Sequence, residues 1–123
     1  MMSEQRPSGS PEPDLWESVS LLHAWLDEKR AHDGRDARED LLLRMLKLSE
    51  EVGEVAQAVI GATGQNPRKG VTHDWDDVRS ELCDVAITAL VALRGLTPDA
   101  GEVFTAHLAK ARQRSLGTLG TAS

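Results

Sequence analysis

Two groups of acidic residues have the spacing that places carboxylates on one face of a helix. Glu50, Glu51 and Glu54 form the first group, and Glu81 and Asp84 form the second. Side chains three or four positions apart are neighbours on a helix, so each group presents its carboxylates side by side. Sites made only of oxygen atoms favour hard cations, which predicts Mg2+, with Mn2+ as a substitute, rather than zinc.

Asp84 carries the most information, because it interrupts the most apolar stretch of the chain, Leu82 to Leu93. We expect this carboxylate to have little access to water and to need a cationic partner. A solvated acidic face explains either group alone. If the two helices pack antiparallel, both groups converge on one point and favour a metal site. The four histidines are scattered and lack the Glu-x-x-His spacing of a di-iron bundle.

Helical periodicity and helix-end signals predict an all-α fold, a four- to five-helix bundle in which two long antiparallel helices carry the acidic groups. Asp14 with Glu17 forms a capping box for the first helix. The second helix is expected to run from Asp36 or Arg38 to Ile60, with Gly61 and Gly64 supplying the stop. Its wide apolar side consists of Leu41, Leu42, Met45, Leu46, Val52, Val55, Ala56 and Val59.

The third helix is expected to begin at Thr72 or Asp74 and to be closed by Gly95. Thr97 reads as the N-cap of a fourth helix, followed by proline at its first position and ending near Ser115. No segment shows the alternation of a strand, so no sheet is expected. In chain order, the expected helices cover about 15–30, 36–60, 74–94 and 98–115.

Composition predicts one domain, residues 14–116, between disordered tails at 1–13 and 117–123. The formal net charge of -6 argues against a broad nucleic-acid interface. No apolar stretch approaches the roughly 20 residues that span a bilayer, so no membrane partner is expected. The single cysteine, Cys83, is expected in the core and leaves no internal disulfide. This pattern predicts a cytoplasmic protein.

The two acidic groups also match the signature of a known family. Glu50-Glu51-Val52-Gly53-Glu54 and Glu81-Leu82-Cys83-Asp84 resemble the E-E-x-x-E and E-x-x-D motifs of the MazG-like group in the all-α NTP pyrophosphatase superfamily. The similarity covers about Trp16 to Arg114 and includes the order of the helices. It implies hydrolysis of a nucleoside triphosphate between the α and β phosphates, giving a nucleoside monophosphate and pyrophosphate.

The resemblance further implies that Glu51, Glu54, Glu81 and Asp84 bind Mg2+, and that Glu50 or Glu51 orients the attacking water. Bound metal ions neutralise phosphate oxygens and lower the pKa of a coordinated water. In similar proteins the first helix forms part of the wall of the pocket that binds the nucleobase. Candidate substrate contacts outside the metal shell are His23, Trp25, Lys47, Asn66, Arg68, Lys69, Lys110 and Arg114.

A helical domain of this size buries a limited share of its surface, so a homo-oligomer, a dimer or a tetramer, is expected. Relatives of this size usually self-associate. The alternative function is a non-catalytic module that binds a nucleotide or metal for regulation, or that pairs with another helical protein.

Overall fold

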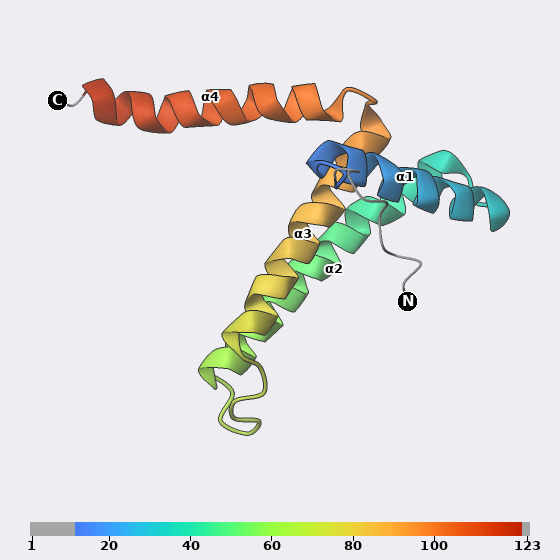
Figure 1. The fold of residues 1–123 in the computed structure, drawn as a ribbon. Coiled ribbons are helices and arrows are strands. Elements are labelled where there is room, and N and C mark those ends of the chain that lie inside the picture. The colour runs from blue at the N-terminus through green and yellow to red at the C-terminus, as the bar shows by residue number, and fades with distance from the viewer. Residues whose placement is uncertain (1–11, 122–123) are drawn as a thin grey trace.

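The computed structural model describes residues 12–121, which form four α-helices and no strand. Figure 1 shows α2 and α3 as an antiparallel pair, α1 across one end of that pair, and α4 extending away from it. The predicted all-helical fold and antiparallel pair are confirmed, although α4 does not fold back into a compact bundle. The helices are α1 (Leu15–His32), α2 (Ala37–Thr63), α3 (Trp75–Leu96) and α4 (Ala100–Thr121).

Side-chain caps explain where the first three helices begin. Asp14 Oδ1 accepts a hydrogen bond of 2.7 Å from the Glu17 backbone N–H, and Glu17 Oε1 accepts one of 3.1 Å from the Asp14 N–H. Asp36 caps α2, and Asp74 opens α3 with a second capping box. Each cap satisfies backbone donors that the first helical turn leaves unpaired. The predicted cap at Asp14 is confirmed. Of the alternatives left open by the sequence, Asp36 rather than Arg38 starts α2, and Asp74 rather than Thr72 starts α3.

Two glycines predicted to end helices lie inside them instead, namely Gly61 in α2, which continues to Thr63, and Gly95 in α3. Gly64 ends α2 in the left-handed conformation, with φ of 66°, as predicted from the preference for glycine just after a helix end. Gly95, however, lies inside α3, which continues to Leu96. A Cβ atom at Gly95 would lie 3.5 Å from the side chains of His23 and Leu41. This is an ordinary van der Waals distance, so Gly95 faces α1 and α2 from inside the helix and does not mark a helix end.

The last helix is longer than predicted. Thr97 Oγ1 accepts a hydrogen bond of 3.1 Å from the Asp99 N–H, which is the capping role expected of it. From Ala100 the helix continues to Thr121, so the predicted helix end near Ser115 is wrong. Residues 122–123 and residues 1–11 of the predicted N-terminal tail lie outside the described range.

The face of α2 that meets α3 is largely polar. Positions 40, 44, 47, 51, 54, 58 and 61 follow one another at steps of four and three, the spacing of a helix seam. The buried residues of α2 all lie on this stripe, namely Asp40, Glu51, Ala58 and Gly61. Much of the predicted apolar side is exposed instead, including Leu42, Met45, Leu46 and Val52.

The end of the α2–α3 pair nearest the connecting loop is closed tightly. The Thr72 backbone N–H donates a hydrogen bond of 3.0 Å to the carbonyl oxygen of Gly61. A Cβ atom at Gly61 would overlap the side chains of His73 and Thr72. Glycine at this position therefore allows the loop to lie directly on α2.

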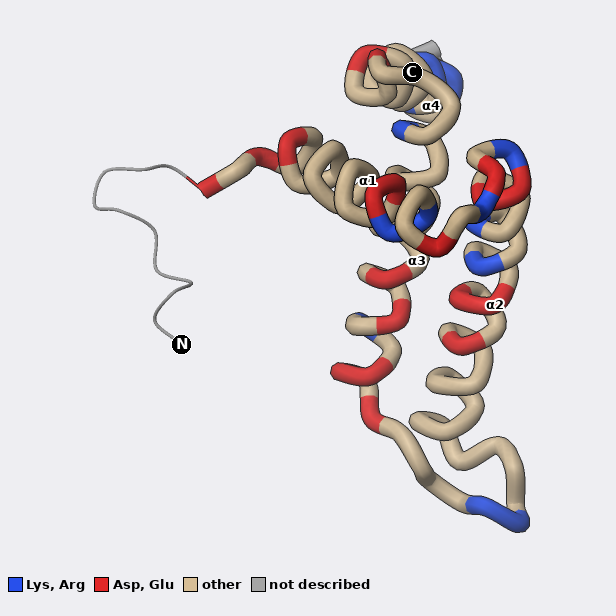
Figure 2. Tube along the Cα trace, turned by 90° about the vertical axis from the view of Figure 1, so that its right-hand side faces the viewer, with Lys and Arg blue, Asp and Glu red and all other residues tan. Residues whose placement is uncertain are grey.

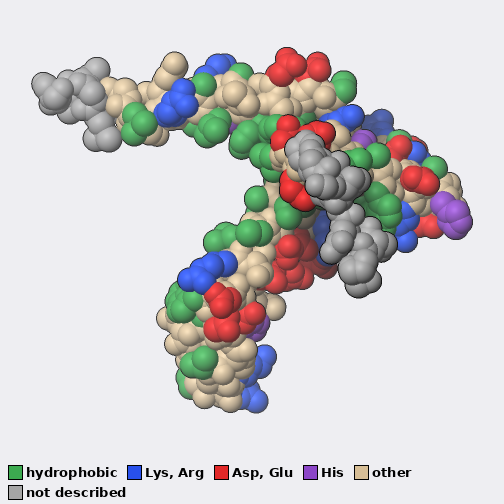
Figure 3. Space-filling view, viewed as in Figure 1, with side chains coloured by type: hydrophobic (Ala, Val, Ile, Leu, Met, Phe, Trp, Pro, Cys, Tyr) green, Lys and Arg blue, Asp and Glu red, His purple; other side chains and the backbone are tan. Residues whose placement is uncertain are grey.

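Within residues 12–121, α4 packs against the other helices mainly through its first turns. Its first turns are anchored by Ala100, which is buried, and by the Phe104 ring, whose centroid lies 5.8 Å from that of Trp16. Beyond them, Leu108 and Leu116 are more than half exposed, and Figure 3 shows hydrophobic side chains along one side of this helix. Within residues 12–121, no helix combines the length and apolar content needed to cross a bilayer.

Candidate metal centre

The two predicted acidic groups meet between α2 and α3. Oxygen atoms of Glu51, Glu81 and Asp84 all lie within 4.8 Å of one another, and the same holds for Glu50, Glu51 and Glu54. Glu51 belongs to both sets and links them. Figure 2 shows acidic segments of α2 and α3 at a similar level of the pair, with further acidic residues on α3 nearer the loop. The fold therefore brings all five predicted acids into one cluster.

Two members of this cluster are shielded from water. The Glu51 side chain is only 10% exposed. Oε2 of Glu81 is buried and has no hydrogen-bond partner. Burial raises the pKa of the Glu81 carboxyl above its ordinary value of 4.5, and the neighbouring carboxyl groups of Glu54, Asp84 and Glu51 raise it further. A buried, unpaired oxygen is costly, and a divalent cation at this position would satisfy it.

Asp84 itself is exposed, so the expectation that it has little access to water is wrong. Cys83, expected in the core, is exposed too. Within the described chain, α3 packs mainly against α2 and α1. The part of α3 that faces away from both stays open even though its residues are apolar, as Leu82 illustrates at 53% exposure. The shielded acid of this helix is Glu81, one turn earlier.

Lys47 neutralises part of the cluster. Its Nζ atom lies 2.7 Å from Glu50 Oε1 and 3.3 Å from Glu51 Oε1. Hydrogen bonds to Glu50 and Glu51 raise the pKa of the Lys47 ammonium well above its usual value. The predicted contact residue Lys47 is thus part of the acidic cluster itself.

A cavity of about 480 Å³ opens next to the cluster, between α1, α2 and α3. The predicted residues Trp25 and Lys47 both line it, and Trp25 is 60% exposed. Most of its other walls are apolar, and its charged lining is predominantly basic. The remaining lining residues are Leu22, Leu26, Lys29, Arg35, Asp40, Leu43, Arg44, Ile87, Thr88 and Val91.

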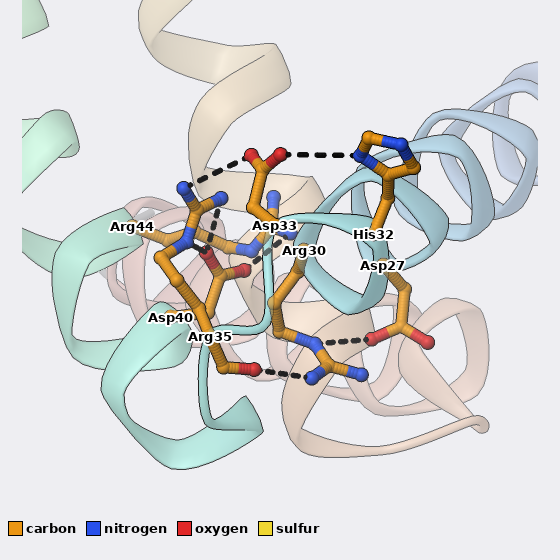
Figure 4. A network of polar contacts seen from close by, with 7 residues as sticks. All are labelled: Asp27, Arg30, His32, Asp33, Arg35, Asp40 and Arg44. Carbon is orange, nitrogen blue, oxygen red and sulfur yellow. Dashed lines mark hydrogen bonds and ion pairs between the residues drawn. The ribbon is translucent and has the colours of Figure 1, made fainter.

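At the far side of this cavity, Asp40 is held by two arginines. Arg44 lies 2.8 Å and Arg35 3.2 Å from the Asp40 carboxylate. Figure 4 shows these contacts together with Arg30, which donates a hydrogen bond of 2.6 Å to the carbonyl oxygen of Arg35. This network connects the loop after α1 to the first turns of α2.

The Asp40 network was not anticipated from the sequence, although a signal for it existed. Asp40 and Arg44 continue the stripe of Lys47, Glu51 and Glu54 towards the start of α2 at steps of four and three. Extending the acidic motif backwards at this spacing identifies both residues. Arg35 lies in a loop, where no periodic pattern applies.

The other predicted contact residues lie in three different places. His23, on α1, lines a smaller cavity with Asp27 and Arg44. Burial lowers the pKa of His23, and the charges of Arg94 and Arg44 lower it further. The imidazole is therefore favoured in its neutral form.

The loop and α4 residues are not brought to the acids within one chain. Asn66 Oδ1 accepts a hydrogen bond of 3.1 Å from the Arg68 N–H, which shapes the tip of the α2–α3 loop. Arg68 and Lys69 are the basic residues of this loop, and Figure 2 shows basic residues at the loop tip, at the far end of the helix pair. Lys110 and Arg114 lie on the part of α4 that extends away from α2 and α3.

A scan against protein-family models, a search of curated proteins and a search of solved structures each find no match to this chain. Its function is therefore inferred from its own residues and their geometry.

Proposed function

We propose that this chain is a Mg2+-dependent nucleoside triphosphate pyrophosphohydrolase, which cleaves its substrate to the monophosphate and pyrophosphate and clears unwanted nucleotides in the cytoplasm. The observation that carries this proposal is the convergence of Glu51, Glu81 and Asp84 around the buried, unpartnered oxygen of Glu81. The resemblance of both acidic motifs to the MazG-like family supplies the reaction.

In this proposal Glu51, Glu54, Glu81 and Asp84 hold Mg2+, with Mn2+ as a substitute. When bound, the ion supplies positive charge for the phosphate oxygens and lowers the pKa of a coordinated water. Glu51 suits a ligand because it is buried between both groups of acids. Glu50 suits the residue that orients the water, since its side chain is 61% exposed at the rim of the cluster.

The neighbouring cavity offers a place for the rest of the substrate. Its apolar walls and the exposed ring of Trp25 suit a nucleobase. Lys29, Arg35 and Arg44 give the same cavity a basic lining that attracts the phosphate chain. Because Lys47 belongs to both the cavity and the acidic cluster, a nucleotide seated there places its phosphates beside the acids.

We also propose that the protein is a homo-oligomer, a dimer or a tetramer. The exposed leucines of α2 and the uncovered length of α4 support this, because an isolated helix is marginal in water and large apolar patches favour association. In such an oligomer, Lys110 and Arg114 of one copy would lie near the acidic cluster of a neighbouring copy, whereas α4 extends away from the cluster of its own chain. Light scattering coupled to size exclusion should give a mass at least twice that of the chain. A monomer at all concentrations would contradict the proposal.

The activity is tested by incubating the pure protein with a panel of ribo- and deoxyribonucleoside triphosphates and Mg2+, and by following the products with phosphorus NMR. Pyrophosphate should appear together with the monophosphate for at least one nucleotide. Glu54→Gln should abolish this, whereas Glu28→Gln, which removes the same charge from the exposed face of α1, should not.

The alternative, a regulatory or interaction module, has a different signature. It predicts that a triphosphate with Mg2+ raises the Tm of the protein yet remains intact. Folded protein that releases no pyrophosphate from any nucleotide would overturn the proposed activity.

A further inference from the structure

Lys47 occupies a junction between the acidic cluster and the neighbouring cavity. We propose that Lys47 is a displaceable internal cation, which neutralises Glu50 and Glu51 in the metal-free protein and moves into the cavity to bind an anionic group of the substrate when a divalent cation takes its place. This inference rests on the proposed metal centre and adds an order of events to it.

The contacts show that Lys47 already occupies the position of a cation. Its Nζ atom is shared between Glu50 Oε1 at 2.7 Å and Glu51 Oε1 at 3.3 Å. Glu51 is the residue that lies within 4.8 Å of both acidic sets. A divalent ion held by Glu51 would therefore lie next to the ammonium group, and two cations at such a separation repel strongly.

The two partners differ in their freedom to move. The Lys47 side chain is 54% exposed, whereas that of Glu51 is 10% exposed. A long, half-exposed side chain changes rotamer at little cost, while a buried carboxylate is fixed by its neighbours. Incoming metal therefore displaces the ammonium and leaves the carboxylate in place.

The destination of Lys47 follows from the cavity that it lines. Lys29, Arg35 and Arg44 contribute positive charge to the same cavity, against Asp40 as its acid. A further ammonium is favoured there only when an anion is present. Metal binding and anion binding should consequently strengthen each other, because the metal releases the lysine that the anion needs.

The first test measures metal affinity by calorimetry, with MnCl2 alone and no nucleotide. Lys47→Met should bind Mn2+ about five- to tenfold more tightly than the unchanged protein, because the competing charge is gone. Arg38→Met is the matched control, since it removes one positive charge from an exposed position of the same helix. Its affinity should stay near that of the unchanged protein. Lys47→Gln replaces Lys47→Met if the latter does not fold.

The second test measures anion binding in saturating Mg2+ with tripolyphosphate as the probe. Lys47→Met should bind it about tenfold more weakly, and Lys47→Arg should recover part of the loss because it restores the charge. The chain has only four lysines, so the side-chain NMR signal of Lys47 can be followed directly. It should shift on addition of Mg2+, whereas that of Lys69 should not.

The outcomes separate this inference from the proposed activity. Equal Mn2+ affinity in Lys47→Met and Arg38→Met, with normal binding by the unchanged protein, overturns the role of Lys47 and leaves the metal centre intact. Failure of every folded form to bind Mn2+ overturns both. Tighter Mn2+ binding together with weaker tripolyphosphate binding supports the displacement.

Discussion

Asp40 and Glu51 lie on the same face of α2 and are buried to the same degree, at 7% exposure each. Their surroundings differ. Asp40 is held by Arg44 and Arg35 at 2.8 and 3.2 Å. Glu51 shares one ammonium, that of Lys47, with Glu50, and lies beside three further acids.

This difference separates a structural ion network from a candidate metal site. At Asp40, Arg44 and Arg35 balance the carboxylate, Arg35 also pairs with Asp33 at 3.4 Å, and the network fixes the loop before α2. Around Glu51, five carboxylates face one lysine. Shielded acids left unbalanced in one place, with a balanced one a few turns away, support the proposal that a cation from solution binds at the first place.

The largest effect is expected from removing a charge of the unbalanced cluster. Asp84→Asn should lower kcat/KM for pyrophosphate release by about 10³-fold, because a metal ligand contributes to the transition state. Its Tm should stay close to that of the unchanged protein, since Asp84 is exposed. Steady-state kinetics and melting curves of Asp84→Asn and the unchanged protein, measured in parallel, test both expectations. Activity within a few-fold of normal would place Asp84 outside the site.

Removing a charge from the network at Asp40 should lower the stability of the fold, in contrast to Asp84→Asn, which should lower activity and leave Tm unchanged. Asp40→Asn leaves Arg44 and Arg35 facing each other without the carboxylate that joins them. We expect a loss of about 2–3 kcal/mol in the free energy of unfolding, at the lower end for a broken buried ion pair because Arg35 is partly exposed. Urea titration with and without Mg2+ tests this. Recovery of the lost stability by Mg2+ would contradict the distinction between the two regions.

A smaller effect on stability is expected at Glu81, where neutralising the carboxyl should raise Tm rather than lower it. Its raised pKa means that the metal-free folded state holds a proton more tightly than the unfolded state. Stability contributed by this proton is complete below the ordinary pKa of 4.5 and is lost as pH rises through the higher folded value. In the presence of a chelator, Tm should therefore increase as pH falls from neutral towards 5.

Glu81→Gln tests the same point, because the amide removes the ionisation. This variant should have a higher Tm than the unchanged protein at neutral pH without metal, and it should lose the Glu81 contribution to the pH dependence. An unchanged pH profile of Tm in this variant would show that another group titrates.

The smallest effect is expected at a solvent-exposed ion pair. Arg79 pairs with Asp76 on α3, with side chains 75% and 79% exposed. Arg79→Ala should change the free energy of unfolding by no more than about 0.5 kcal/mol, because water and salt screen the pair. Urea titrations of Arg79→Ala and Asp40→Asn under the same conditions compare the two losses in the free energy of unfolding. A loss as large as that of Asp40→Asn would mean that burial does not govern these pairs.

The elements of the fold were predictable where a local signal decides the outcome. Asp14 caps its helix as predicted, and Asp36 and Asp74 are each one of the two predicted starts, because a cap depends on residues within one turn. The convergence of Glu51 with Glu81 followed from periodicity and an antiparallel pair. Gly95 was misassigned because a glycine near the end of an apolar stretch can also lie inside the helix, here facing His23 and Leu41.

Which way a helix face points could not be predicted. Leu42, Leu46 and Val52 form part of an apolar side, yet they are exposed while the polar stripe of α2 faces α3. Periodicity identifies a face but not its partner, and a partner from another copy leaves no mark in the pattern. The same limit explains Asp84, whose apolar neighbours suggested burial that the fold does not provide.

The contact between Gly61 and the loop has a consequence for the chemistry some turns away. The loop before α3 lies directly on α2 at this end because position 61 has no side chain, and Glu54 lies on the same stripe of α2. A methyl group at position 61 would push Thr72 and His73, and the start of α3 that follows them, away from α2, and would widen the space between the carboxylates of Glu54 and Glu81 in the proposed metal site. Ion preference would then shift from the small Mg2+ towards the larger Ca2+, so calorimetric titration of Gly61→Ala with both ions would reveal a selectivity set by a residue that touches neither.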